Sequence, residues 1–502
     1  MRGIYSSVTD IRRRVFTEIA RLSYEGTSLD EMEKLPYKIL PGEIGKYRDS
    51  IFLERAIVSE RLRLCMGLPL RPVDKQCPIE EGIEASACAQ KYYDPPLVNV
   101  IKFACNACPE KSFHVTNLCQ GCLAHPCSEV CPKGAVSIVH GKSVIDQEKC
   151  IKCGQCANVC PYGAINKMER PCAKACGMNA ISSDAQGRAE IDYDKCVSCG
   201  QCIVNCPFGA ISDKGQIYQV IQAMKEGKRV YAAVAPAFVS QFGPDMTPEK
   251  LCAAMKLLGF HDMVEVAIGA DLCTIEEAKD FLREVPDIQP FMATSCCPAW
   301  SVMAKKLFPD FEPYISMAMT PMVLTARLIK KEHRDCKVVF IGPCAAKKLE
   351  ASRRTIRSDV DFVLTFEEIM GMFEARSVEF SALTHTSKVE EGTGDGRNFA
   401  VSGGVAAAVV DVCKRLAPER EIKVMAAQGL NDCRKMLMLA KTGKLDGYLL
   451  EGMACPGGCV AGAGTLTNPT KAAAALAKYK AAAPVQNAYD TKYDITLPLL
   501  HD

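Results

Sequence analysis

The feature that most limits how this chain can fold is the clustering of its cysteines. The chain has 502 residues and 29 cysteines, and sixteen of these cysteines fall between residues 101 and 210. Three runs of four, each ending in Cys-Pro, lie there: Cys119, Cys122, Cys127 and Cys131; Cys150, Cys153, Cys156 and Cys160; Cys196, Cys199, Cys202 and Cys206. The N-terminal residues lack the apolar core of a signal peptide. In a long chain of this kind, dense cysteines indicate metal binding or redox chemistry rather than disulfides.

The spacing within these runs indicates iron–sulfur clusters. The second and third runs both read C-x2-C-x2-C-x3-C-P, the bacterial ferredoxin run, whose fourth cysteine ligates the other cluster of a pair. Three thiolates from one tight loop can reach three irons of one cube, whereas the fourth lies too far along the chain. Thiolates also suit zinc, but zinc sites usually pair two CxxC units across a longer gap. We therefore expect 4Fe–4S clusters.

An internal repeat extends this interpretation. The stretch that begins at Pro126 aligns with the one that begins at Pro171, so that Cys127 corresponds to Cys172 and Cys131 to Cys176. Each copy reads as a cysteine loop, a short strand, a turn, a second strand and another cysteine loop. The repeat predicts tandem α+β ferredoxin-like modules, over residues 101–165 and 166–220.

The repeat also suggests how the ligands divide among about four accessory clusters. The expected sets are Cys119, Cys122, Cys127 and Cys160; Cys131, Cys150, Cys153 and Cys156; Cys176, Cys196, Cys199 and Cys202; and Cys105, Cys108, Cys172 and Cys206. The last set borrows its CxxC unit from upstream of the repeat. Two alternatives stay open: Cys160 could replace Cys176 in the third set, or Cys105 and Cys108 could be free thiols with one cube missing.

Residues 1–100 carry less information. Apolar positions three to four apart predict amphipathic helices, and we expect a helical region packed on the ferredoxin-like modules. Cys65, Cys77 and Cys88 have no motif spacing and are expected to be buried thiols. The net charge of +2 gives no reason to expect nucleic acid or a membrane surface. No run approaches the roughly 18 apolar residues of a membrane span, and we expect a cytoplasmic protein.

From about residue 228 apolar runs alternate with helical patterns, which predicts an α/β domain with parallel sheet over residues 221–485, followed by a tail at 486–502. In such sheets ligands bind beyond the carboxyl ends of the strands, in a cleft. Three expected strand ends carry cysteine: "TSCCPAW" holds Cys296 and Cys297, "PCAAKKLE" holds Cys344, and "EGMACPGGC" holds Cys455 and Cys459. Neighbouring Cα atoms lie about 3.8 Å apart, whereas disulfides want roughly 4.4–6.8 Å, so Cys296 and Cys297 are expected to have separate roles.

These three segments resemble, in order, the signature segments of the iron-only (FeFe) hydrogenases, and the resemblance covers about residues 140–465. It implies that Cys297, Cys344, Cys455 and Cys459 bind a 4Fe–4S cube. Cys459 would also bridge to a two-iron unit that carries carbon monoxide, cyanide and a dithiolate with a central amine, which completes the H-cluster. Four further residues would surround the unit: Lys347 as donor to a cyanide, Pro236 and Ala237 beside the other cyanide, and Met453.

Other correspondences concern the pocket wall. Ser402, in "FAVSGG", resembles another wall segment. Lys348 is expected to be the solvated neighbour of Lys347. Two departures from the family pattern make the pocket less standard: Gly342 stands where a methionine is frequent, and Met322 where a glutamine is frequent. They leave the expected metal ligands intact and resemble a divergent subgroup.

The same resemblance implies a path for protons. Cys296 matches the terminal proton donor, and Glu277, Asp280 and Ser316 match the relay behind it. Glu277 and Asp280 are three residues apart, which places them on one face of a helix. The alternative for both acids is a solvated helix face.

The resemblance therefore implies an oxidoreductase that interconverts H2 with protons and electrons in anaerobic hydrogen metabolism. The accessory clusters would exchange electrons with ferredoxin or a similar carrier, and maturation enzymes would supply the two-iron unit. The alternatives are a hydrogenase-like protein of iron–sulfur assembly or H2 sensing, and an electron-transfer polyferredoxin. Assembly relatives typically lose parts of the three signatures, whereas this chain keeps all five cysteines and Lys347.

Overall fold

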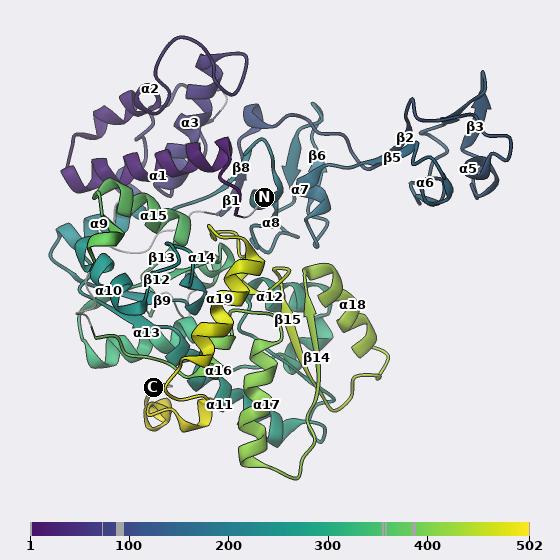
Figure 1. Cartoon of the computed structure of the whole chain (residues 1–502). Helices are drawn as coiled ribbons and strands as arrows, with labels where there is room; N and C mark the ends of the chain where they lie inside the picture. Colours follow the sequence, from purple (N-terminus) through teal and green to yellow (C-terminus); the bar gives the residue numbers. More distant parts are fainter. Residues whose placement is uncertain are drawn as a thin grey trace.

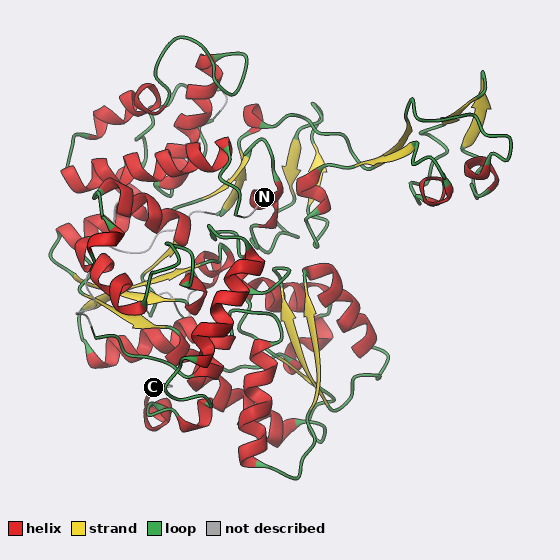
Figure 2. Cartoon of the chain, viewed as in Figure 1, coloured by secondary structure: helices red, strands yellow, loops and turns green. Residues whose placement is uncertain are grey.

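The C-terminal half contains two parallel sheets. The computed structural model describes residues 3–72, 74–86, 95–353, 356, 359–383 and 388–500. The larger sheet has the order β10-β9-β12-β13, with bounds Asp262–Glu265, Arg229–Val234, Cys336–Gly342 and Phe362–Thr365. The smaller has the order β11-β15-β14, with bounds Met292–Ala293, Tyr448–Met453 and Lys423–Gln428. All of these pairs are parallel, which confirms the expected α/β class (Figure 2).

Helices surround both sheets (Figure 1). Their bounds are α9 Ile217–Lys225, α10 Pro248–Leu257, α11 Ala267–Glu284, α12 Pro298–Leu307, α13 Pro321–Glu332, α14 Ala346–Ala351, α15 Phe366–Ala375, α16 Gly394–Asn398, α17 Gly404–Leu416, α18 Leu430–Ala440 and α19 Pro469–Ala481. Strand β12 is buried along nearly its whole length, as parallel strands covered on both faces must be. In the tail, Leu497 and Leu500 pack into a core with Ile268 and Leu272 of α11.

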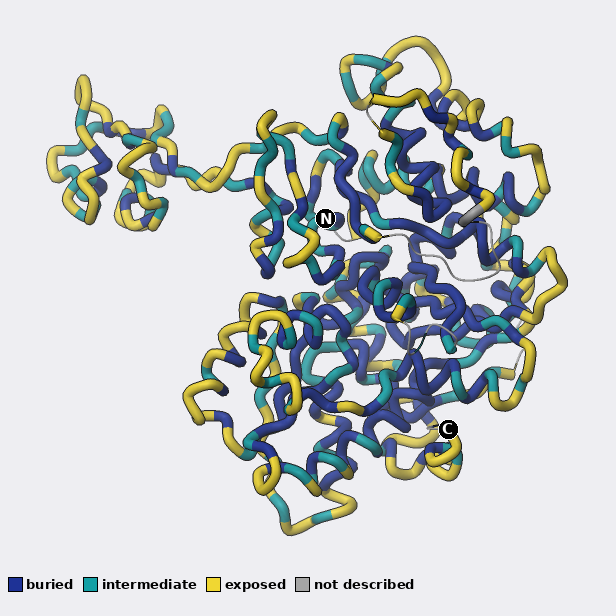
Figure 3. Tube along the Cα trace, turned by 180° about the vertical axis from the view of Figure 1, so that it is seen from behind, coloured by how far each residue is buried: buried dark blue, intermediate teal, exposed yellow. Residues whose placement is uncertain are grey.

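The first cysteine-rich module projects from the rest of the molecule (Figures 1 and 3). Its elements are β2 Ser112–Val115 paired with β5 Ile165–Met168, the hairpin β3 Val136–Val139 and β4 Lys142–Ile145, and the short helices α5 Pro126–Glu129 and α6 Gln155–Val159. It has a small core of its own, which includes Phe113, Val136 and Ile165. Each half contributes a cysteine loop, a short helix and a strand, as the repeat predicts.

The second module is assembled from two separate segments. Its elements are β1 Val98–Val100 paired with β8 Ile211–Asp213, the hairpin β6 Ile181–Ser183 and β7 Ala189–Ile191, and the helices α7 Pro171–Lys174 and α8 Gln201–Asn205. Residues 98–108 therefore belong with the second module, whereas the sequence interpretation placed residues 101–108 in the first. The first module is inserted between Cys108 and Arg170, and its boundaries differ accordingly from 101–165.

The N-terminal region is helical, with α1 Ser7–Glu25, α2 Leu35–Ile39, α3 Ile51–Cys65 and α4 Ile83–Ser86. Ser6 caps α1 by accepting a hydrogen bond from the backbone of Thr9. Helix α1 crosses α15 closely, since a Cβ on Gly371 would lie 2.5 Å from Phe16 Cβ. The region therefore packs on the C-terminal α/β domain as well as on the second module. Cys65 and Cys77 are buried, and Cys88 lies outside the described residues.

Among the described residues, no helix combines the length and the apolar character that crossing a bilayer requires.

Candidate functional site

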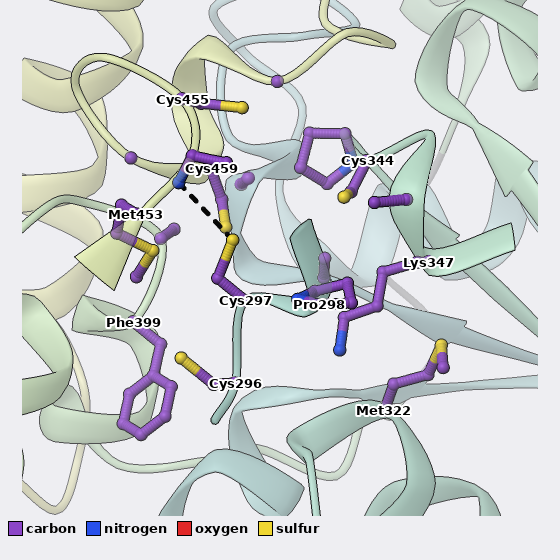
Figure 4. A pocket seen from close by; sticks show the side chains of 18 of the residues that line it. Cys296, Cys297, Pro298, Met322, Cys344, Lys347, Phe399, Met453, Cys455 and Cys459 are labelled. Atoms are coloured by element: carbon purple, nitrogen blue, oxygen red, sulfur yellow. Dashed lines mark hydrogen bonds between the residues drawn. The ribbon is translucent and has the colours of Figure 1, made fainter. Parts of the chain in front are cut away.

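The carboxyl ends of four strands open onto one pocket (Figure 4). Cys297 lies after β11 and is the N-cap of α12, with Pro298 at the first helical position. Cys344 follows β12, and Cys455 and Cys459 follow β15. All four thiols line the pocket, although their cysteines come from three segments spread over more than 150 residues of the chain. Parallel topology brings the strand ends of the smaller sheet to one edge, and the larger sheet contributes Cys344 from the end of β12 to the same pocket.

Two glycines shape the loop between Cys455 and Cys459. Gly457 and Gly458 have φ of +96° and +89°, which L side chains rarely adopt. A Cβ on Gly458 would lie 2.5 Å from the backbone nitrogen of Ser402. Ser402 therefore supports this loop from behind and is not among the residues that line the pocket. Phe399 and Ala400, just upstream, form that wall instead.

The other expected wall residues do line the pocket. Pro236 and Ala237 follow β9, Met453 ends β15, and Met322 lies in the first turn of α13. Met453 and Ala237 are almost completely buried, with exposed fractions of 2% and 1%. The pocket is therefore apolar on these sides, and its polar groups are confined to the thiols and to Lys347.

Lys347 extends into the pocket from α14 (Figure 4). Its Nζ lies 2.7 Å from Glu350 Oε2 in a buried ion pair, yet it makes no hydrogen bond with any residue that the structure describes. Burial acts to lower the pKa of Lys347, but the Glu350 carboxylate and the nearby thiols of Cys344 and Cys296 together outweigh burial, and the pKa is raised. The ammonium group is thus charged and has donor capacity left over, which fits an anionic acceptor in the pocket.

Lys348 was expected to be solvated, and this expectation is wrong. Its side chain is 1% exposed and forms ion pairs with Asp213 at 2.8 Å and Glu368 at 3.1 Å. Asp213 ends β8 of the second cysteine-rich module, and Glu368 lies on α15. The two adjacent lysines therefore face opposite ways, since Lys347 points into the pocket and Lys348 joins the module to the C-terminal α/β domain.

Cys296 lies on the same pocket beside Glu277. Cys296 lines the pocket from below Cys297, and burial, with Glu277 adding to it, raises the pKa of its thiol. Glu277 is fully buried on α11 and accepts a hydrogen bond from the Ser295 backbone at 3.3 Å. Burial raises the pKa of Glu277 to about 7, although Ser316 and Ser295 act against burial. The two groups therefore hold protons near neutrality within one buried region.

The two outer residues of the expected relay, Ser316 and Asp280, differ in their exposure to solvent. Ser316 is buried, and its hydroxyl oxygen accepts a hydrogen bond from the Ala318 backbone at 3.2 Å. Asp280 lies one turn beyond Glu277 on α11 and is half-buried. It forms an ion pair with Arg283 at 2.6 Å. Asp280 is thus near solvent, on the same helix as a carboxyl that is fully buried.

The cysteines of the second module line two further pockets. One is lined by Cys176, Cys196, Cys199 and Cys202, and the other by Cys105, Cys108, Cys172 and Cys206. These are the third and fourth expected sets. Cys160, the alternative third-set ligand, lies in the core of the projecting module instead. Cys199 also lines the pocket of Cys297, and Gln201 Nε2 donates to Cys455 Sγ at 3.2 Å.

The projecting module brings its own cysteines together. Its core contains Cys127 and Cys156, with Cys131, Cys150 and Cys160 packed against it. Cys119 accepts a hydrogen bond from the Ser143 backbone at 3.5 Å, and Ser143 Oγ lies 3.1 Å from Cys127 Sγ. In the described ranges, no three His, Cys, Asp or Glu side chains group as a single metal ion would need. A cube instead accepts its four thiolates at separate corners.

Sequence reasoning missed several residues of the site. Glu350 is three residues after Lys347 on a short helix, and this i,i+3 spacing was a usable signal. Gln201 and Phe399 carried no signal, because their contacts join segments far apart in the chain. Arg48 and Arg61, which donate hydrogen bonds to the backbone just after Cys206, were also missed, because they come from the N-terminal region.

The sequence of this chain is similar to those of known iron–sulfur proteins. Residues 228–463 match the family described as iron only hydrogenase large subunit, C-terminal domain, and residues 143–166 and 189–212 match the 4Fe-4S binding domain. Iron hydrogenase 1 of Clostridium pasteurianum is 28% identical over 424 residues, which are 73% of this chain and 73% of that protein. The periplasmic Fe hydrogenase large subunit of Nitratidesulfovibrio vulgaris is 29% identical over 65% of this chain and 86% of its own length.

A different kind of relative also matches. Cytosolic iron-sulfur assembly component 3 of Bos taurus is 28% identical over 46% of this chain and 59% of its own length.

Among solved structures, the FeFe-hydrogenase HydA1 from Chlamydomonas reinhardtii is 22% identical with a TM-score of 0.46, over 55% of this chain and 93% of that one.

Proposed function

Because this chain belongs to the iron-only-hydrogenase-like proteins and carries 4Fe–4S binding motifs, we propose that it catalyses H2 ⇌ 2 H+ + 2 e−. One observation supports this most: Cys297, Cys344, Cys455 and Cys459 line a single buried pocket together with Cys296 and Lys347. Four thiols suit a 4Fe–4S cube. The leftover donor capacity of Lys347 suits the anionic two-iron unit.

The protein supplies binding and orientation around this group. When bound, the H-cluster supplies the iron atoms at which H2 is formed or split. The four cysteines hold its cube, and Gly457 and Gly458 let the loop backbone approach closely. Lys347 would donate a hydrogen bond to a cyanide of the bound group, while Pro236, Ala237 and Met453 would exclude water from it. Ser402 acts indirectly, by supporting the loop that carries Cys459.

Protons travel through the buried side chains behind the pocket. Cys296 is the terminal proton donor and acceptor of this path, because it lines the pocket without being needed as a cube ligand. Glu277 exchanges protons with it, since its pKa of about 7 lets it gain and lose a proton near neutrality. Ser316 and the half-buried Asp280 continue the route towards solvent.

Electrons travel through the accessory clusters. We assign four cubes to the cysteine sets named above, and Cys199 links the third set to the catalytic pocket because it lines both pockets. The projecting module lies farthest from the catalytic domain (Figure 1), and it would hold the first two cubes. A ferredoxin or similar carrier in the cytoplasm would exchange electrons there.

An assembly role is the second candidate, because an assembly component matches nearly half of this chain. One experiment separates the two. The chain is produced with and without the maturation enzymes, and infrared bands of bound carbonyl and cyanide are recorded together with H2 evolution from a reduced carrier. We expect bands and turnover only after maturation.

Two variants make this experiment specific. Cys455→Ala removes a proposed ligand and should abolish the bands. Cys433→Ala removes a buried thiol that contacts Met453 O at 3.6 Å outside the pocket, and it should keep them. Matured protein with full iron content but neither bands nor turnover would contradict the hydrogenase proposal and favour assembly.

A further inference from the structure

The N-terminal region encloses the pocket of Cys105, Cys108, Cys172 and Cys206. Ile57 and Leu64 of α3 share a buried core with Cys172 and Cys206. The loop after Cys206 has no space for a side chain at Gly209. A Cβ there would lie 2.6 Å from Arg61 Nη2 and 2.8 Å from Val8 Cγ1. Both α1 and α3 thus close over this loop, although residues 1–100 lie outside the matched family segments.

Arginines bind the backbone beside three of these four cysteines. Arg61 Nη2 donates to Gly209 O, three residues after Cys206. Arg48 Nη2 donates to Ala104 O at 2.9 Å and to Phe208 O at 3.3 Å, beside Cys105 and Cys206 respectively. Arg170 Nη2 donates to the carbonyl of Cys108 itself at 2.8 Å.

Arg61 is a buried arginine that forms no ion pair among the described residues. It is 6% exposed, and its Nε has no hydrogen-bond partner in the described part of the chain. Burial lowers the pKa of Arg61 to about 10, with Arg12 adding to this effect and Cys206 opposing it. The guanidinium is therefore cationic at neutral pH. Arg12, its neighbour, is instead neutralised by Glu367 at 2.6 Å.

Such a charge changes the redox behaviour of a cluster. Reduction adds one negative charge to a cube, and net charge and burial are among the factors that set its potential. A buried cation attracts this charge with little screening by solvent or salt. The third pocket has no Arg or Lys among its lining residues. Lys306, an exposed residue, donates to Cys196 O at 3.2 Å. The fourth pocket, by contrast, is lined by Arg170, and Arg61 binds the loop that follows Cys206.

We propose that Arg61 raises the reduction potential of the fourth cluster, so that this cluster accepts an electron before the third one does. The inference rests on the ligand set proposed above. It gives residues 1–100 a function: they tune one cluster of the chain. The fourth cluster lies beside the connection to the projecting module, since Cys108 and Arg170 flank the insertion. It would therefore hold an electron between the projecting module and the catalytic pocket.

The test is an EPR-monitored redox titration of the full chain carrying its 4Fe–4S clusters. A Cys172→Ala variant first identifies the signal of the fourth cluster. Arg61→Met removes the charge at similar volume, and we expect the reduction equilibrium to weaken at least tenfold, about 59 mV towards negative potential for a one-electron couple. Arg61→Lys keeps the charge and should leave the midpoint close to that of the wild type.

Arg63→Met is the matched control. Arg63 lies on the same helix and is 3% exposed, but it donates to the carbonyls of Pro69, Pro78, Ile79 and Glu81, away from the clusters. A shift in Arg63→Met equal to that in Arg61→Met would mean that α3 acts structurally, and would overturn the proposal. An unshifted midpoint in Arg61→Met, or equal shifts in the Met and Lys variants, would overturn it as well.

If the Arg61 variants do not fold, a variant that changes the local charge in the opposite direction still tests the proposal. Glu367→Gln leaves Arg12 without its carboxylate and adds net positive charge near Cys206, which shares a pocket with both residues. The midpoint should move in the positive direction, and a negative shift or no shift would overturn the proposal. If Cys172→Ala retains full iron and every EPR signal, the proposed ligand set of the fourth cluster is wrong. This result is distinct from an unshifted midpoint in Arg61→Met, which would contradict only the charge effect.

Discussion

The backbone N–H of Ser295 donates to Glu277 Oε1 at 3.3 Å, which joins the fully buried carboxyl of α11 to the residue just before Cys296. The other oxygen, Glu277 Oε2, makes no hydrogen bond to any described residue. One carboxyl oxygen is thus held in place, and the other is left to receive or release a proton. This geometry carries the first prediction.

Glu277→Gln should slow H2 turnover by about 10²–10⁴-fold, the usual contribution of a positioned acid or base. Burial raises the pKa of Glu277 to about 7, so the carboxyl is half protonated at neutrality and loses its proton above that pH. Infrared spectra of the wild type should contain a carboxylic acid C=O band that disappears with a midpoint near pH 7. The band should be missing in the variant, and its persistence there would assign it to another residue.

Cys296→Ser should separate cofactor binding from proton transfer. A hydroxyl keeps the size of the side chain but is a much weaker acid than a thiol, so turnover should collapse while the carbonyl and cyanide bands stay. Cys413→Ser is the control, because Cys413 is equally buried but contacts Ala278 O at 3.8 Å, away from the pocket. A normal rate in Cys296→Ser, measured by H2 evolution, would end the proposed relay.

The expected α/β domain and the grouping of the cysteines were readable in the sequence for physical reasons. Parallel strands put their carboxyl ends at one edge, so Cys297 and Cys455 had to lie near each other. Cys344 follows a strand of the other sheet and reaches the same pocket through the way the two sheets meet. The repeat aligned Cys172 with Cys127, which exposed the missing CxxC unit and pointed to Cys105 and Cys108. Both inferences use local patterns whose geometry is largely independent of the rest of the fold.

What escaped sequence reasoning depends on contacts between distant segments. Lys348 is buried because Asp213 and Glu368 surround it, and nothing near Lys348 in the sequence identifies them. The second module takes β1 from upstream of the insertion, because β1 pairs with β8 across more than 100 residues. Arg61 reaches Gly209 from a helix without any cysteine motif.

Replacing each of the neighbouring lysines by methionine should impair a different property: cofactor binding for Lys347 and stability for Lys348. Lys347→Met removes the pocket donor, so the cube should remain while the two-iron unit and its infrared bands are lost. Lys348→Met leaves Asp213 and Glu368 buried without their cation, and breaking such a group costs about 3–5 kcal/mol. Thermal unfolding of the cluster-bearing chain should show the large loss for Lys348→Met, and equal losses for both variants would contradict their separate roles.

The pairing of the third cluster can be tested with two cysteines that differ in position. Cys176 lines the pocket of Cys196, Cys199 and Cys202, whereas Cys160 lies in the projecting module. Cys176→Ala should therefore alter the EPR signal of the cluster nearest the catalytic pocket, and Cys160→Ala should leave that signal unchanged. The opposite result would restore the alternative pairing through Cys160.

The last prediction concerns stability and a carboxyl away from the clusters. Asp271 is fully buried on α11 and accepts hydrogen bonds from Thr393 N at 2.8 Å and Thr393 Oγ1 at 2.6 Å. Burial raises its pKa from 3.8 to about 8. The folded chain therefore binds this proton more tightly than the unfolded chain does. The resulting stability is fully present below about pH 3.8 and is lost as the pH rises towards 8.

Asp271→Asn should remove this dependence, because an amide mimics the protonated acid and cannot ionise. Between pH 6 and 8 the wild type should lose on the order of 2 kcal/mol more stability than the variant, since one pKa unit corresponds to about 1.4 kcal/mol. Scanning calorimetry of the cluster-bearing chain under anaerobic conditions measures the difference in Tm. Asp411→Asn, at an exposed position, should parallel the wild type. If Asp271→Asn loses stability with pH as steeply as the wild type does, Asp271 is not the group that binds the proton.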